Sequence, residues 1–142
     1  MENTDVERRP THINVHCWGS TFGEALERAA IALTDIVVDP ADFVSQDDLR
    51  IFADGKDDVE LVYSFLDEVL FAFDAKQFVV KSIEVKDTKP TTVEAVAHGK
   101  PFGNHPDKRR LDVKAITCSK VVRRDQRTDI YVSFKVGVPT RM

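Results

Sequence analysis

The sequence predicts an α+β domain in which two helices pack on one face of a mixed β-sheet. The chain has 142 residues, of which 42% are hydrophobic and 31% are charged, as is typical of one folded domain. Two segments repeat their apolar residues with the period of a helix, and six alternate them with the period of a strand. The order strand, helix, strand, helix and then four strands differs from the regular alternation of a doubly wound sheet. We expect residues 11–142 to form this domain and the polar residues 1–10 to form a flexible arm.

The strands are predicted where apolar and polar residues alternate. The first covers residues 12–18, and the second covers residues 49–53 and ends at the turn signal Asp54-Gly55. The other four strands are predicted at residues 78–85, 91–98, 111–122 and 129–138. The connection over residues 99–110 is rich in glycine, proline and charge, and it is long enough to be a functional loop.

Both helices are predicted from their N-terminal signals. Thr21 and Glu24 have the spacing of a capping box, ahead of an apolar helical stripe that must stop at Pro40. Asp57 and Glu60 repeat this spacing ahead of a wider stripe. The width of the second stripe implies a helix that packs against more than one neighbour.

The charge of the chain is distributed unevenly. The net charge of −4 argues against broad nucleic-acid binding. Residues 1–74 carry 5 Lys and Arg against 17 Asp and Glu, whereas residues 75–142 carry 15 against 7. We expect this asymmetry to disappear in the fold, because an acidic helix can lie beside a basic strand.

The lack of targeting signals and the small number of cysteines predict a soluble protein of a reducing compartment. The N-terminal segment lacks the apolar run of a signal peptide, and no stretch is long enough to span a membrane. The two cysteines are too few for a disulfide framework. We therefore expect a cytoplasmic protein with no membrane partner, which could also occur in the nucleus.

No common catalytic motif is present in the sequence. It matches no P-loop, dinucleotide-binding glycine motif, serine-nucleophile elbow or zinc-protease helix. An enzyme is therefore not indicated, and we predict no catalytic residue and no cofactor. The acidic pairs Asp47-Asp48, Asp57-Asp58 and Asp67-Glu68 are better explained as solvated faces and helix caps, because adjacent side chains point in different directions.

Two arrangements of reactive side chains have both a chemical and a structural interpretation. Cys118 could form a thiolate–imidazole pair with His98 or His105, although a cysteine within a strand is more often a core residue. His98 and His105 could also bind a metal, although their spacing matches no familiar ligand motif and favours a polar loop.

Basic residues surround the strand predicted at 111–122. Lys108, Arg109 and Arg110 precede it, and Arg123 and Arg124 end it. They could form a ridge that binds an acidic protein surface, or a hairpin that is merely solvated. No aromatic residue is interleaved with them in the sequence, so they lack the platform on which single-stranded RNA stacks.

Three segments together resemble the archease family. Residues 16–30 resemble its strand–Trp-Gly–helix opening, residues 57–73 its second helix, and residues 112–117 (Asp-Val-Lys-Ala-Ile-Thr) its most recognisable strand motif. Their order and spacing agree as well, and the resemblance extends over about residues 12–138. It implies a small α+β protein that is not itself a catalyst. Archeases assist the RtcB-type RNA ligase in tRNA splicing, where they promote its guanylylation and repeated turnover. The implied partner is that ligase, with RNA contacted only through it.

The resemblance also implies a divalent cation held by two aspartates, one on the first strand and one near the end of the last. The matching positions here are His12 and Lys135. Ca²⁺ and Mg²⁺ prefer oxygen ligands, and a protonated ammonium cannot ligate a metal. We therefore expect the metal site to be lost, with Asp5 as a remote candidate ligand. Lys135 could place its own charge where the ion would sit, or extend into solvent.

Other positions match the family more closely. Asp112 and Lys114 match its strand motif, and His105 matches the preceding loop. With Lys108, Arg109 and Arg110 they form the predicted partner-binding surface. The structural alternative for Lys114 and His105 is a strand-edge salt bridge and a turn residue. A second functional reading is a divergent archease-fold interaction protein that has lost the metal site and metal-dependent activation.

Overall fold

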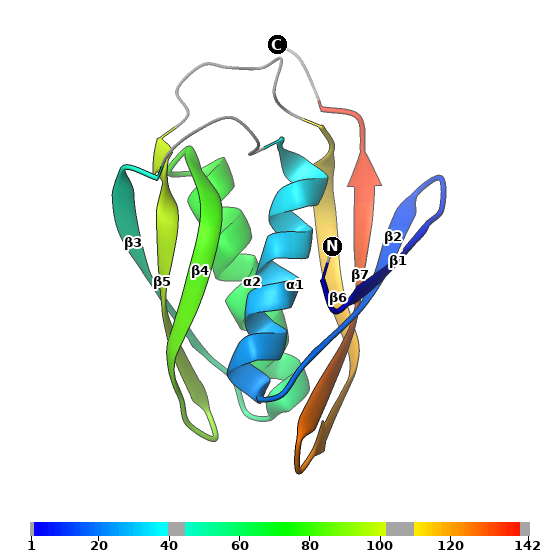
Figure 1. Cartoon of the computed structure of the whole chain (residues 1–142). Coiled ribbons are helices and arrows are strands. Elements are labelled where there is room, and N and C mark those ends of the chain that lie inside the picture. Colours follow the sequence, from blue (N-terminus) through cyan, green and yellow to red (C-terminus); the bar gives the residue numbers. More distant parts are fainter. Residues whose placement is uncertain (1, 40–44, 102–109, 140–142) are drawn as a thin grey trace.

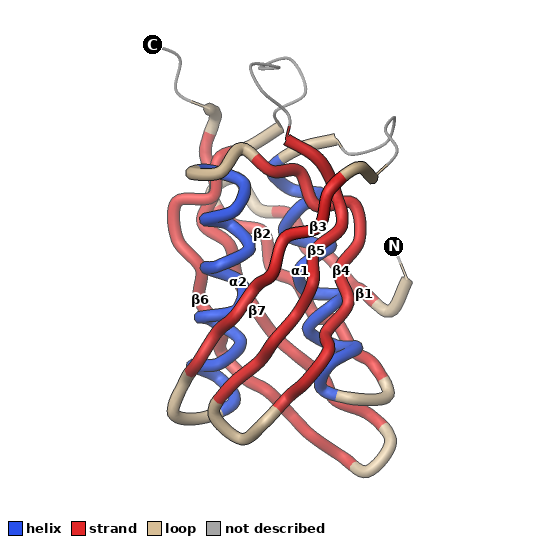
Figure 2. Tube along the Cα trace, turned by 90° about the vertical axis from the view of Figure 1, so that its left-hand side faces the viewer, coloured by secondary structure: helices blue, strands red, loops and turns tan. Residues whose placement is uncertain are grey.

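The computed structural model describes residues 2–39, 45–101 and 110–139, which form two β-sheets with two helices between them (Figure 1). In chain order the elements are β1 (Thr4–Arg8), β2 (His12–Gly19), α1 (Phe22–Val37), β3 (Asp47–Asp54), α2 (Asp58–Asp74), β4 (Phe78–Thr88), β5 (Thr92–Pro101), β6 (Asp112–Arg124) and β7 (Arg127–Gly137). Figure 2 shows β3, β5 and β4 in front of both helices. The molecule therefore has three layers.

The described strands pair only in the antiparallel direction. One sheet has the order β1-β2-β7-β6, and the other has the order β3-β5-β4. The α+β class with two helices is confirmed, but two antiparallel sheets enclose the helices where one mixed sheet was expected. Alternation shows which face of a strand is buried, and it does not show which strands pair. The β4–β5 hairpin pairs with β3 from the N-terminal half, and the β6–β7 hairpin pairs with β2, which in turn pairs with β1.

The helices form the middle layer because both have apolar faces toward both sheets. α1 packs against β4 on one side and against β2 and β7 on the other, whereas α2 packs against β3 and β6. Phe65 and Leu66 of α2 and Phe134 of β7 are fully buried between the layers. This packing confirms that the wide apolar stripe of the second helix contacts more than one neighbour. Neither of these helices is long and apolar enough to cross a membrane.

Both predicted capping boxes are confirmed. The Thr21 hydroxyl accepts a hydrogen bond from the backbone N–H of Glu24 at 3.1 Å, and the Glu24 carboxylate accepts one from the N–H of Ser20 at 2.7 Å. At the start of α2, the Asp57 carboxylate accepts a hydrogen bond from the N–H of Glu60 at 2.9 Å. These contacts satisfy backbone donors that the first turn leaves free.

The prediction of a flexible arm is wrong for residues 4–8, which form strand β1. This strand pairs with β2 in an antiparallel register that places Asp5 opposite His16. No residue of β1 is buried, because it is an edge strand that extends beside the helical layer. A strand that is exposed on both faces has no apolar alternation, so the periodicity of the sequence could not reveal it.

Acidic and basic segments lie beside each other, as expected from the charge distribution. Arg123 of β6 donates a hydrogen bond to Asp58 of α2 at 3.3 Å. Arg110, just before β6, lies 3.2 Å from Asp35 and 3.6 Å from Asp39 at the end of α1. The opposite charges of the two halves therefore compensate each other across these contacts.

Candidate functional site

The outer face of the four-stranded sheet, turned away from the helices, carries a buried carboxylate with three basic neighbours. Arg127 donates two hydrogen bonds to Asp129, at 2.9 and 2.8 Å, and the Nε2 atom of His16 lies 2.7 Å from the same carboxylate. Arg124 lies 3.7 Å from it. Asp129 is only 3% exposed. The hydrogen bonds from Arg127, followed by the contact with His16, hold the pKa of Asp129 well below its ordinary value.

Aromatic rings surround this carboxylate. Tyr131 stacks on His16 with ring centres 4.2 Å apart and planes 7° apart. Trp18 lies 5.0 Å from His16, and the Arg127 guanidinium lies 4.8 Å above the Trp18 ring. Lys120 lies 4.9 Å from the centre of Tyr131 on the other side. We call Lys120, Tyr131, His16, Trp18 and Arg127 the aromatic–cation row.

A shallow hollow opens beside this row on the outer face. Its volume is about 370 Å³. Polar side chains from four strands line it, namely Asp5, Glu7, Asn14, His16, Ser119, Tyr131 and Ser133, together with Val6, Val15 and Val132. The hollow is therefore rich in hydrogen-bond donors and acceptors, with a pair of stacked rings on one side.

The two positions suggested for a metal face each other at one end of the same sheet. The register of β2 and β7 places His12 directly opposite Lys135. Both side chains are exposed, and the Thr11 hydroxyl lies 2.7 Å from the Nδ1 atom of His12. In the described part of the chain, no group of three or more histidine, cysteine, aspartate or glutamate side chains could hold a metal ion. An imidazole opposite an ammonium does not fit a hard divalent cation.

Asp5 is far from this pair. It lies opposite His16, with 3.9 Å between its carboxylate and the Nδ1 atom of that histidine. His16 is four residues beyond His12 on β2, which corresponds to about 13 Å along a strand. Asp5 therefore belongs to the hollow and cannot complete a site at His12 and Lys135 without a rearrangement of β1.

The structure brings together part of the predicted partner-binding surface. Lys114 and Asp112 at the start of β6 form an ion pair at 3.4 Å, with 46% of the Lys114 side chain exposed. The register of β6 shifts between Val113 and Ala115, so Lys114 is the extra residue of a β-bulge. Arg110 is held against α1 instead. His105, Lys108 and Arg109 lie outside the described residues.

Comparison with known proteins identifies the family. The model of the Archease protein family (MTH1598/TM1083) matches residues 9–136. The chain belongs to the archease family. It is 35% identical over 113 residues to a "Protein archease-like" of Drosophila melanogaster, covering 75% of this chain and 70% of that one. It is 34% identical over 110 residues to a "Protein archease" of Pyrococcus furiosus, covering 74% and 76%.

A solved structure shares the archease fold. The solution structure of Methanobacterium thermoautotrophicum protein 1598 matches with a TM-score of 0.81 and 24% identity, over 95% of this chain and 99% of that one. The two-sheet arrangement with enclosed helices is therefore that of a known fold. At this identity the likeness concerns the fold.

For this archease, we expect Ca²⁺, Mg²⁺ and Mn²⁺ to bind more weakly than micromolar, because the facing side chains of His12 and Lys135 supply no carboxylate oxygen. Calorimetric titration of the purified chain measures the affinity. A stoichiometric site of micromolar affinity or better would contradict the expectation. In that case Asp5→Asn identifies whether the strand β1 supplies the ligand.

The remaining reactive side chains of this archease have structural roles. Cys118 is buried, and burial raises the pKa of its thiol to about 11, so the prediction of a core residue is confirmed. Burial likewise raises the pKa of Cys17 to about 12. His98 lies on the other sheet, where its two ring nitrogens contact the carboxylates of Asp48 and Glu84 and so are not available to bind a metal. His105 lies outside the described residues.

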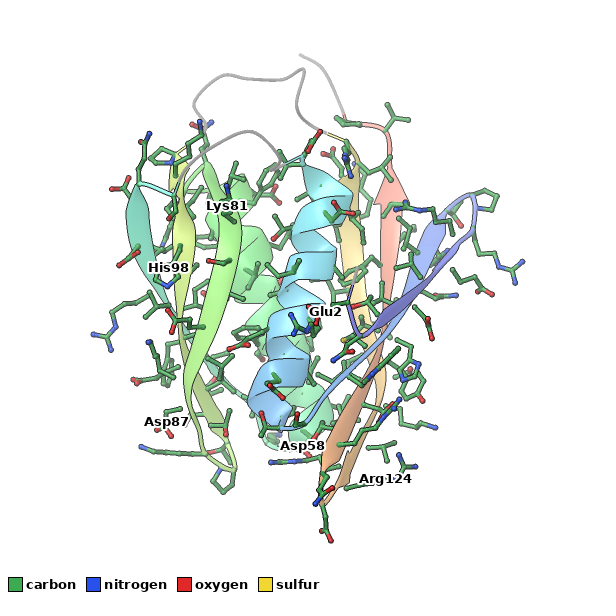
Figure 3. All side chains as sticks on the ribbon, in the orientation of Figure 1. Glu2, Asp58, Lys81, Asp87, His98 and Arg124 are labelled. Atoms are coloured by element: carbon green, nitrogen blue, oxygen red, sulfur yellow. The ribbon has the colours of Figure 1, made fainter. Side chains whose placement is uncertain are left out.

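His98 of β5, labelled in Figure 3, links all three strands of the smaller sheet. Its Nδ1 atom lies 2.6 Å from Asp48 of β3, and its Nε2 atom lies 2.7 Å from Glu84 of β4. These contacts, Asp48 first, raise the pKa of His98 above its ordinary value of 6.5. The imidazolium therefore stabilises the sheet fully below pH 6.5, and this stability is lost as the pH rises through the raised pKa.

We accordingly expect the free energy of unfolding to decrease with pH above about 6.5 through loss of the His98 proton. Urea unfolding at a series of pH values measures this slope, and NMR titration measures the pKa of His98. The His98→Gln variant should lose this pH-dependent stability. The His12→Gln variant should keep it, because His12 is an exposed residue on the other sheet. An unchanged slope in His98→Gln would show that another group causes it.

Proposed function

We propose that this archease is a protein cofactor of an RtcB-type RNA ligase and promotes its guanylylation and repeated turnover in tRNA splicing. The proposal is supported by the family match over residues 9–136, which includes every element from β2 to β6 and all of β7 except its last residue. In this proposal the ligase performs the chemistry and this chain is an activator. The high pKa values of both thiols agree with a role other than nucleophilic catalysis.

The pair formed by His12 and Lys135 supports a second candidate function. Because these side chains cannot replace two aspartates around a divalent cation, any activation that requires this ion would be lost. In this alternative, the chain is an archease-fold interaction protein that still binds its partner. The difference between the two candidates is therefore activation of the ligase.

Multiple-turnover RNA ligation by a cognate ligase, with and without this protein, tests both candidates. Activation predicts more than one ligated product per ligase molecule only when the protein is present. Association with the ligase without an increase in turnover would support the alternative. The absence of both association and activation would contradict both.

A charge reversal tests whether the start of β6 contacts the partner. We expect Lys114→Glu to weaken ligase association by about 1–3 kcal/mol if Lys114 forms a buried charged contact in the complex. The matched control is Lys89→Glu, because Lys89 is also exposed and paired with an aspartate two residues earlier, at 3.7 Å, on the other sheet. The control should change association by at most about 0.5 kcal/mol.

Binding is measured at low and at moderate salt, because salt screens long-range attraction more than a buried contact. A loss that is confined to low salt would indicate steering of the partner rather than contact. Equal affinities for Lys114→Glu and the unmodified protein, with both folded, would show that this surface does not bind the ligase.

A further inference from the structure

Basic and aromatic side chains that are distant in the sequence lie together on the outer face of the four-stranded sheet. In the sequence, the cations of β6 have no aromatic neighbours. In the structure, Lys120 of β6 lies against Tyr131 of β7, and Tyr131 stacks on His16 of β2. Trp18 and Arg127 continue the row on the same face. Along the aromatic–cation row, three rings therefore lie between the cations Lys120 and Arg127.

This face is open in the described part of the chain. The helices cover only the inner face of the four-stranded sheet, as Figure 1 shows, and side chains of the outer face extend away from the molecule in Figure 3. Figure 3 places Arg124 at the lower end of this sheet. Its side chain is 66% exposed, and that of Arg127 is 47% exposed.

The charge of this part of the face is positive. Lys120, Arg124 and Arg127 supply three cations, and Asp129 is the carboxylate that the described structure pairs with both arginines. Asp129 is buried beneath them, whereas the exposed carboxylates near these cations are Asp125 in the β6–β7 turn and Asp5 and Glu7 on β1. A polyanion that crosses the lower end of the sheet would therefore meet positive charge and aromatic rings together.

The hollow beside the row has the size and chemistry of a base-binding pocket. Its volume of about 370 Å³ falls within the usual range for small ligands. Ser133 provides a hydroxyl group, Asp5 and Glu7 provide acceptors, and Asn14, whose amide donates to Glu7 at 2.9 Å, provides a further amide group for the donors and acceptors on a base edge. The stacked rings of Tyr131 and His16 form its apolar side.

We propose that the outer face of the four-stranded sheet binds single-stranded RNA, with phosphates on Lys120, Arg124 and Arg127 and a base in the hollow beside Tyr131. Single strands are bound in this manner because their bases are free to contact aromatic side chains while cations hold the backbone. A segment of acidic side chains alone would use the same cations but would bring no ring to the hollow beside Tyr131 and His16. This binding is direct and does not depend on the proposed ligase partnership.

The protein contains its own reporter for this proposal, because Trp18 is the single tryptophan of the chain. We expect a 12-nucleotide oligouridylate to quench Trp18 fluorescence at low salt. The affinity should decrease with salt with a logarithmic slope of about −2, because three phosphate contacts contribute about −0.7 each on a single strand. Arg124→Ser should weaken binding several-fold and reduce this slope by about 0.7.

The matched control is Arg50→Ser on the smaller sheet, because Arg50 is 84% exposed and paired with Glu94 at 3.8 Å. This variant should bind the oligonucleotide like the unmodified protein. Tyr131→Leu, checked for folding by circular dichroism, should weaken binding with an unchanged salt slope, because it removes a ring and no charge.

Three results would overturn the proposal. The first is an absence of quenching at low salt. The second is an equal loss of affinity in Arg50→Ser and Arg124→Ser, which would show non-specific attraction to the whole surface. The third is equal binding of a polyglutamate peptide, which would identify an acidic protein as the partner. An active ligase is not needed in any of these measurements, so failure here leaves the ligase proposal unaffected.

Discussion

Phe65→Ala is expected to lower the free energy of unfolding by about 3–5 kcal/mol, because it empties a large volume between the two sheets. Phe65 is fully buried on α2, the helix that contacts both β3 and β6. Its removal leaves a cavity that neither sheet can fill without shifting relative to the other. Equilibrium unfolding in urea measures the loss.

The same helix provides a matched control. Phe71 is 53% exposed, and the ammonium of Lys76 lies 6.0 Å from the centre of its ring. Phe71→Ala should therefore cost at most about 1 kcal/mol, since little apolar surface returns to water. If both variants lost equal stability, α2 would not be packed between two sheets as described.

Much of the fold could be predicted from the sequence because local signals determine the helices. Thr21 and Asp57 cap them where the capping-box spacing indicates, and both apolar stripes face the core. The strands with one buried face could also be predicted, from their alternation of apolar and polar residues. Pairing could not be predicted, because the partner of Asp5 or of His12 depends on residues distant in the chain. The edge strand β1 could not be predicted either, because it has no alternation of apolar and polar residues.

The candidate sites also differ in how far they could be predicted from local sequence. Asp112 and Lys114 are neighbours on one strand, so their pairing follows from local sequence, and their contact with a partner stays a prediction. The cluster around Asp129 was missed, because its histidine lies 113 residues away on a strand whose pairing was unknown. One signal was available: Asp129 sits in a strand between buried positions, where a carboxylate requires a partner.

Asp129→Asn is expected to lower the free energy of unfolding by about 2–4 kcal/mol, because it removes a buried charge and replaces one of the two acceptor oxygens that Arg127 and His16 share with an NH2 donor. The amide keeps the shape of the carboxylate, so the loss reports on charge and hydrogen bonding. Glu94→Gln breaks the exposed ion pair with Arg50 and should cost at most about 0.5 kcal/mol. Urea unfolding near pH 7 compares the two variants.

The pH dependence of this difference identifies Asp129 itself. Its pKa in the folded state is lowered by Arg127 and His16, so its contribution is complete above the ordinary value of 3.8 and decreases as the pH falls through the folded pKa. The stability gap between the unmodified protein and Asp129→Asn should therefore be constant from about pH 5 to 7 and narrow below about pH 4. A gap that persists unchanged at lower pH would mean that the asparagine disrupts packing, and that the ion pair with Arg127 contributes little to the sheet.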